Sequence, residues 1–186
     1  MNNLQGINVG LDISTSVVGV CALDCATNNL VKLFAIKLTS SKFKDEYDKA
    51  EEVRRILKEE LGSYSIKNIF IEEAHMRFTP GFSSAKTLFT LATFNGIVSQ
   101  ITYDSFGTKP QKINVRTARK NLGIKINTKD KSKSNKEKVF DAVVERNPDF
   151  PWYKRIPTAG KNKGVEIYDQ TCFDMADAWV IVAGAR

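Results

Sequence analysis

The sequence predicts a single α/β domain that spans residues 1–186, and three observations lead to this prediction. Three strand-like segments open the chain, and their short connections favour an antiparallel meander. Strand and helix patterns then alternate until the chain ends in a helix. The composition is that of a globular domain with a real core, since 42% of the 186 residues are hydrophobic and 26% are charged.

Each element follows from the spacing of apolar residues and from the turn signals between them. Strand segments alternate with period two, and helical segments show apolar residues three and four apart. In the first half, the pattern predicts strands at 6–12, 17–23 and 30–38, a helix at 45–61, a strand at 67–74 and a helix at 83–103. In the second half, it predicts a short strand at 112–115, a helical turn or two at 117–122, a helix from about 135 to 146 and a last helix at 170–184.

Three of the remaining patterns bear on function. The helix at 83–103 is apolar around most of its circumference, so it is either a core helix or one that also forms a subunit interface. Residues 125–138 hold six lysines and few apolar side chains, which predicts a mobile basic loop leading into a helix capped near Asn135. Residues 148–164 are predicted to form a second loop.

Four carboxylates in three places are the strongest indication of function. Asp12 ends the first strand, Glu72 closes the apolar run of the fourth, and Asp174 and Asp177 lie three apart on one face of the last helix. Desolvated like charges are costly unless they are paired or bound to a metal, and Mg²⁺ and Mn²⁺ prefer oxygen ligands. The set therefore predicts a metal-dependent enzyme that acts on phosphate esters.

Two of these assignments have alternatives. Glu73 follows Glu72 in a strand of alternating residues, so only one of them faces the side of Asp12, and the pattern does not decide which. Acidic residues near a helix start also suit the helix dipole, which by itself accounts for Asp174 and Asp177. The apolar residues 179–182 mark the same helix as buried, however, and this favours the metal site.

Several other classes of protein do not fit the sequence. Cys21, Cys25 and Cys172 lack paired zinc-type spacing and are predicted to be buried, reduced thiols. His75 is the only histidine, so no multi-histidine metal site can form, and no serine lies in a G-x-S-x-G elbow. Neither a signal segment nor a membrane span is evident, so an intracellular protein of the cytoplasm or nucleoid is expected.

Basic residues are concentrated in one part of the chain. The net charge is +7, yet residues 106–163 contain 16 basic and 5 acidic side chains, a local balance of +11. The rest of the chain has a balance of −4. A lysine-rich solvated surface would give the same asymmetry, but acidic residues at a site with a basic flank are typical of a protein that cleaves a polyanion.

Three motifs, in this order along the chain, resemble those of one family. They are Gly10-Leu11-Asp12 followed by a polar turn and Val18-Gly19-Val20, then Ile71-Glu72-Glu73, and then Asp174-Met175-Ala176-Asp177-Ala178. Together they resemble the RuvC-like Holliday junction resolvases of the RNase H-like superfamily. The resemblance implies an RNase H-like fold, a five-stranded mixed sheet of three antiparallel and then parallel strands, flanked by helices. It also implies Glu72 rather than Glu73 as the ligand.

The same resemblance implies an activity. The expected protein is an endonuclease that makes paired symmetric nicks in four-way DNA junctions, with two Mg²⁺ or Mn²⁺ ions held by Asp12, Glu72, Asp174 and Asp177. Such ions suit in-line attack on a phosphodiester, with Asp12 bridging them. Because two like-oriented strands must be cut, a twofold homodimer through the helix at 83–103 is expected.

The sequence departs from the family in places. His75 occupies the position where the family often has an aromatic wedge, with Phe78 and Phe82 just beyond it. The run 92–96 differs from the family's usual interface sequence, and the long segments 124–138 and 148–164 suggest a divergent viral or organellar branch. The expected DNA contacts are His75, Phe78, Phe82, Lys112, Arg116, Arg119, Lys120, Lys131, Lys133 and Lys136.

Other functions remain open on the sequence. One is an RNase H-like nuclease that acts on flaps, other branched DNA or RNA–DNA hybrids. Another is a non-cleaving junction-binding module, although a pure binder would gain stability by losing the repelling carboxylates. A sugar-kinase or actin-like ATPase also begins with a glycine-aspartate strand, but this chain is too short for two lobes.

Overall fold

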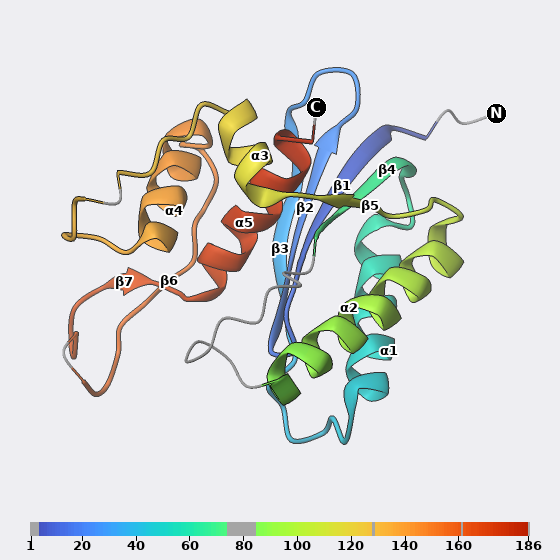
Figure 1. Cartoon of the computed structure of the whole chain (residues 1–186), viewed down its shortest axis with the longest axis horizontal. Coiled ribbons are helices and arrows are strands. Elements are labelled where there is room, and N and C mark those ends of the chain that lie inside the picture. The colour runs from blue at the N-terminus through green and yellow to red at the C-terminus, as the bar shows by residue number, and fades with distance from the viewer. Residues whose placement is uncertain (1–3, 74–84, 128, 161, 186) are drawn as a thin grey trace.

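The computed structural model describes residues 4–73, 85–127, 129–160 and 162–185, and its centre is a five-stranded sheet. The strand order is β3-β2-β1-β4-β5; the first three strands are antiparallel, and β4 and β5 run parallel to β1 (Figure 1). The strands are β1 (Gly6–Ile13), β2 (Val17–Asp24), β3 (Leu30–Lys37), β4 (Ser65–Glu72) and β5 (Gln111–Ile113). The predicted mixed sheet is confirmed.

Helices cover both faces of this sheet, and a separate apolar core lies under each set (Figure 1). One face carries α1 (Glu46–Leu61) and α2 (Ala85–Phe106). The other carries α3 (Val115–Asn121), α4 (Asn135–Arg146) and α5 (Thr171–Ala183). Alternate side chains of the central strands point into the two cores, so both faces are buried and the strands are apolar almost throughout.

Helix caps explain where two of the helices begin. The Asp45 carboxylate accepts hydrogen bonds from the first backbone N–H groups of α1, which would otherwise lack partners. At α4 the cap is Ser134, one residue before the predicted Asn135, and it forms a capping box with Glu137. Because α4 begins at Asn135, Lys136 has a fixed position on its first turn.

The structure also corrects the predicted elements. The segment 148–164 is not entirely loop, because β6 (Lys154–Arg155) pairs with β7 (Ile167–Tyr168) in a small antiparallel ribbon. Two-residue strands are too short to show an alternating pattern, which is why the sequence did not reveal them. Val115, predicted to end a strand, begins α3 instead.

The cysteines and the helix lengths complete the description of the fold. Cys21 and Cys172 are buried free thiols as predicted, but the prediction of burial is wrong for Cys25, which is exposed because it lies in the turn between β2 and β3. Across the described ranges, every helix is too short or too polar to serve as a membrane span.

Candidate active site

Asp12 and Glu72 end two neighbouring strands at the same edge of the sheet. Strands β1 and β4 are parallel, and Leu11 pairs with Ile71, so the next residue of each strand is one of the two carboxylates. Parallel strands present their carboxyl ends together, which is where ligands bind in open α/β sheets. The two acidic residues, 60 positions apart in the sequence, are therefore neighbours in the fold.

The strand register decides between Glu72 and Glu73. On β4, Ile69 and Ile71 pack into the core under α1 and α2, whereas Phe70 packs into the core under α5. Glu72 shares the face of Phe70 because side chains alternate along a strand. Glu73 is exposed, and its N–H donates to the Ile113 carbonyl, 2.9 Å away. Glu72 is thus the residue on the side of Asp12, as expected.

Two glycines allow α5 to approach the sheet closely. A Cβ atom at Gly19, opposite Asp12 on β2, would overlap the backbone carbonyl of Asp174, and one at Gly10 would overlap that of Ala178. Any larger residue would therefore force α5 away from the strands. The glycines of the first motif thus place Asp174 and Asp177 directly over the strand that carries Asp12.

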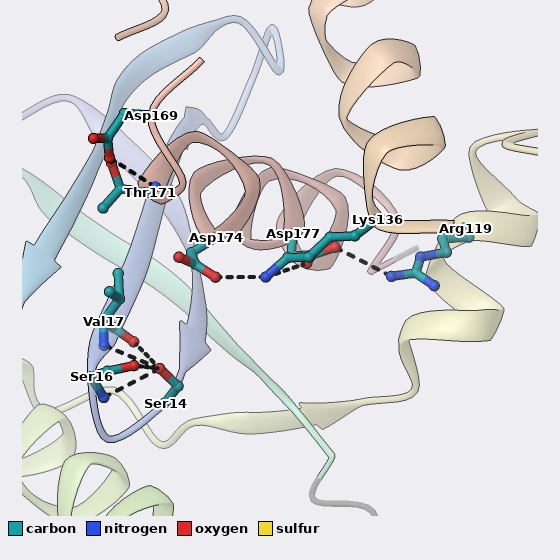
Figure 2. A network of polar contacts seen from close by, with 9 residues as sticks. All are labelled: Ser14, Ser16, Val17, Arg119, Lys136, Asp169, Thr171, Asp174 and Asp177. Carbon is teal, nitrogen blue, oxygen red and sulfur yellow. Dashed lines mark hydrogen bonds and ion pairs between the residues drawn. The ribbon is translucent and has the colours of Figure 1, made fainter. Parts of the chain in front are cut away.

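Two basic residues contact the helical carboxylates. Lys136 Nζ of α4 lies 2.8 Å from Asp174 Oδ1 and 3.9 Å from Asp177 Oδ2 (Figure 2). Arg119 Nη2 of α3 donates to Asp177 Oδ1 at 3.2 Å. The side chains of Asp174 and Asp177 are only 18% and 14% exposed, so these ion pairs are partly shielded from water.

Burial and mutual repulsion disfavour the charged forms of the carboxylates. Burial, followed by the charges of Asp177 and Glu72, raises the pKa of Asp12 well above its ordinary value, although Lys136 opposes the shift. Burial also raises the pKa of Asp177, against the effects of Lys136 and Arg119. Burial lowers the pKa of the Lys136 ammonium, but its ion pair with Asp174 and the charges of Asp177 and Asp12 outweigh this and raise it. Negative charge at this site is only partly compensated.

All of these groups line one cavity. It has a volume of about 440 Å³, and all four predicted carboxylates line it together with Lys136 and Arg119. Arg119 Nε is buried and, within the described part of the chain, has no hydrogen-bond partner. Acidic oxygens beside unpaired basic donors are the groups that a metal ion and a phosphate ester require.

The donor set fits a hard divalent cation. Four carboxylates of three elements share one shielded cavity, and the raised pKa of Asp12 indicates a charge that a cation would compensate. Within residues 4–73, 85–127, 129–160 and 162–185, no three His, Cys, Asp or Glu side chains already converge as metal ligands. Since Lys136 and Arg119 engage Asp174 and Asp177, a cation would have to displace these ion pairs.

The structure separates the predicted DNA contacts into groups. Lys136 and Arg119 lie at the carboxylates. Lys112 Nζ donates to Asn95 Oδ1 of α2 at 2.5 Å, and burial lowers its pKa. Lys133 pairs with Asp141 at 2.7 Å. Of the others, Arg116, Lys120 and Lys131 are exposed, and His75, Phe78 and Phe82 lie outside the described residues.

Some residues of the cavity were missed by the sequence prediction. Ser14, in the turn after β1, lines it, and its hydroxyl bonds with the backbone of Val17 (Figure 2). Asn135 and Leu91 line it from α4 and α2. The polar turn was visible in the sequence, but nothing there indicated that α2 and α4 reach the same cavity.

The strand order and the helices on both faces define an RNase H-like fold. The solved structures that this chain matches include Thermus thermophilus RuvC in complex with a Holliday junction substrate, with a TM-score of 0.61 and 13% identity over 96% of this chain and 90% of that one. The yeast mitochondrial Holliday junction resolvase Ydc2 matches with a TM-score of 0.57 and 12% identity over 95% of this chain and 76% of that one. No protein-family model and no curated protein matches the sequence.

Proposed function

We propose that this protein is a metal-dependent endonuclease that cuts branched DNA, above all four-way junctions. One observation carries the proposal: carboxylates from β1, β4 and α5 line a single cavity at the carboxyl end of the central strands. The fold supports it, because structures that share this fold include RuvC in complex with a Holliday junction substrate.

The residues have distinct roles in this proposal. Asp12, Glu72, Asp174 and Asp177 would hold Mg²⁺ or Mn²⁺, which supplies an activated water and stabilises the departing oxygen of a phosphodiester. Arg119 and Lys136, which now pair with Asp177 and Asp174, would be free to hold phosphate oxygens if these carboxylates were bound to metal.

The first experiment is a cleavage assay on a synthetic four-way junction, with duplex and single-flap controls, in Mg²⁺, in Mn²⁺ and in chelator. Wild-type protein is expected to make paired symmetric nicks in the junction only when metal is present. Asp174→Asn is expected to lower the rate at least about 100-fold, since it removes a charged ligand. Asp149→Asn, at an exposed aspartate outside the cavity, is the matched control and should cut normally.

The other outcomes of this assay separate the alternatives. Equal cutting of the flap or the duplex would show a general branched-DNA nuclease. Tight junction binding without nicks in either metal would favour a non-cleaving binding module, and the catalytic roles would then be withdrawn.

We further propose a twofold homodimer through α2. The exposed face of this helix carries large side chains near its ends, Phe89 (73% exposed) and Tyr103 (46%). Between them, the exposed residues Ala92, Thr93 and Gly96 are small, which lets a second helix approach closely. A dimer of this kind presents two active sites to a junction of approximate twofold symmetry.

Phe89→Asp is expected to convert this dimer to a monomer, because a carboxylate at the interface would be desolvated without a partner. Light scattering coupled to size-exclusion chromatography measures the change in mass. Tyr47→Asp, which replaces a 69%-exposed aromatic of α1, is the control and should leave the mass unchanged. A wild-type protein that is monomeric at all concentrations would contradict the proposed dimer.

A further inference from the structure

A second hollow adjoins the active-site cavity. Its volume is about 750 Å³, and residues from the turn after β1, the end of β3, β6 and the starts of α4 and α5 line it. Lys136 and Asp174 line both hollows, so the two meet at this ion pair (Figure 2). Ser14 lines the active-site cavity and Ser16 lines the second hollow, so one tight turn borders both.

Three cations and three carboxylates line this hollow. The cations are Lys37, Arg155 and Lys136, and the carboxylates are Glu137, Asp169 and Asp174. Lys136 pairs with Asp174 at 2.8 Å, and Glu137 Oε2 accepts the Ser134 N–H at 2.7 Å in the cap of α4. Among the described residues, Lys37 and Arg155 form ion pairs only with Asp169.

Asp169 serves as an anchor for these two cations. Its Oδ1 accepts the Thr171 hydroxyl at 2.6 Å and the Thr171 N–H at 3.0 Å, and these bonds lower its pKa (Figure 2). Lys37 and Arg155 lie 3.7 and 3.9 Å from it, beyond the length of a strong hydrogen bond. Their side chains are 63% and 44% exposed, so most of their donors can reach another anion.

The β6–β7 ribbon holds Arg155 in a defined place. The Asp169 N–H donates to the Tyr153 carbonyl at 2.9 Å, and Tyr168 packs edge-on against Phe140 of α4 with ring centroids 4.8 Å apart. Arg155 pairs with Ile167 across the ribbon. The ribbon therefore fixes the backbone of Arg155 beside Asp169.

We propose that this hollow is a phosphate-binding groove, in which Lys37 and Arg155 hold the sugar-phosphate backbone of the DNA strand beside its cleavage point. The inference rests on the proposed function and extends it to the path of the strand. A strand with its scissile phosphate at the carboxylates continues past Asp174, and the adjoining hollow offers two cations and the hydroxyl groups of Ser16, Thr39 and Ser134. Contacts of this kind hold the backbone without reading its sequence.

The test measures junction binding by fluorescence anisotropy over a range of salt concentrations, with the full chain in chelator so that no cleavage occurs. The variants are Lys37→Gln, Arg155→Gln and their double, which remove charge without placing a new carboxylate beside Asp169. Each single change is expected to weaken binding and to reduce the slope of log affinity against log salt by about one. Lys58→Gln, on the exposed side of α1 on the opposite face of the sheet, is the matched control.

A second arm locates the contact. A single neutral methylphosphonate is placed at successive positions near the cleavage site. At one of these positions the wild type should bind the modified junction more weakly than the unmodified one. Arg155→Gln should bind both junctions equally at that position, because the contact is already lost. Thermal unfolding of each variant must match the wild type, so that a loss of binding is not a loss of folding.

The outcomes distinguish the two proposals. Wild-type protein that does not bind the junction would overturn the proposed function and the groove together. If the wild type binds the junction and the variants bind it with equal affinity and equal salt slope, the proposed groove is wrong. The proposed function would then still stand.

Discussion

Asp12→Asn is expected to abolish DNA cleavage and, at the same time, to stabilise the metal-free protein. Asparagine keeps the shape of the side chain but cannot supply the central anionic ligand, so the cleavage rate should fall at least about 1000-fold. Burial and the charges of Asp177 and Glu72 raise the pKa of Asp12, so its ionised form destabilises the fold. Removing that charge should raise the melting temperature by about 2–4 °C, the shift that roughly 1 kcal/mol produces in a domain of this size.

The size of this effect depends on pH. A carboxyl with a raised folded-state pKa contributes stability below its unfolded pKa, about 4, and loses that contribution as the pH rises through the folded pKa. The gain from Asp12→Asn should therefore be largest near neutral pH and vanish in acid. Calorimetry at several pH values measures it.

Added metal gives a second readout for the same variant. Mg²⁺ or Mn²⁺ should raise the melting temperature of the wild type by mass action and have little effect on Asp12→Asn. Glu73→Gln, at the exposed residue that follows β4, is the control and should match the wild type in cleavage and in metal response. A variant that cuts at the wild-type rate would remove Asp12 from the proposed site.

Gly19→Ala is expected to cause a large loss of stability through the addition of a single methyl group. The added Cβ would overlap the carbonyl group of Asp174, which is backbone and cannot rotate away. Separating α5 from β2 would open the core that contains Met175 and Trp179, at a cost of about 3 kcal/mol. Chemical denaturation measures this loss, and cleavage should fall with it because Asp174 moves.

A matched glycine provides the control. Gly96 lies in the interior of α2, and a Cβ there would meet no other atom within 4 Å. Gly96→Ala should therefore raise the free energy of unfolding by up to about 1 kcal/mol through helix propensity alone. This free energy is measured in dilute solution. If Gly19→Ala were as stable as the wild type, the close approach of α5 to β2 would be wrong.

Much of the fold could be predicted because its signals are local. The three opening strands, the helix that ends at Leu61 and the last helix all show clear periodicity, and the structure has each of them. The β6–β7 ribbon escaped because its strands have two residues each, and their pairing depends on contacts with α4 and α5 rather than on their own sequence. Local patterns do not record such contacts.

The candidate site divides in the same way. The sequence made it evident that acidic residues end two strands, at Asp12 and Glu72. The spacing of Asp174 and Asp177 likewise showed that they share one helix face. The ion pairs of Lys136 and Arg119 with these carboxylates were not evident, because the sequence pattern predicts the same DNA-contacting role for all basic residues of this region. A lysine in a basic segment has no sequence feature that marks it as the partner of one distant aspartate.

The sequence by itself determined the order and type of the main elements and singled out Asp12, Asp174, Asp177 and one of Glu72 and Glu73 as candidate site residues. Periodicity and residue chemistry are properties of short segments, so they can be recognised without knowledge of the fold. Only the tertiary structure decided that Glu72 rather than Glu73 faces Asp12, that Gly10 and Gly19 let α5 rest on the sheet, and that Lys37 and Arg155 border the same ion pair. These relations join residues far apart in the chain, and they exist only after strand register and helix packing have brought those residues together.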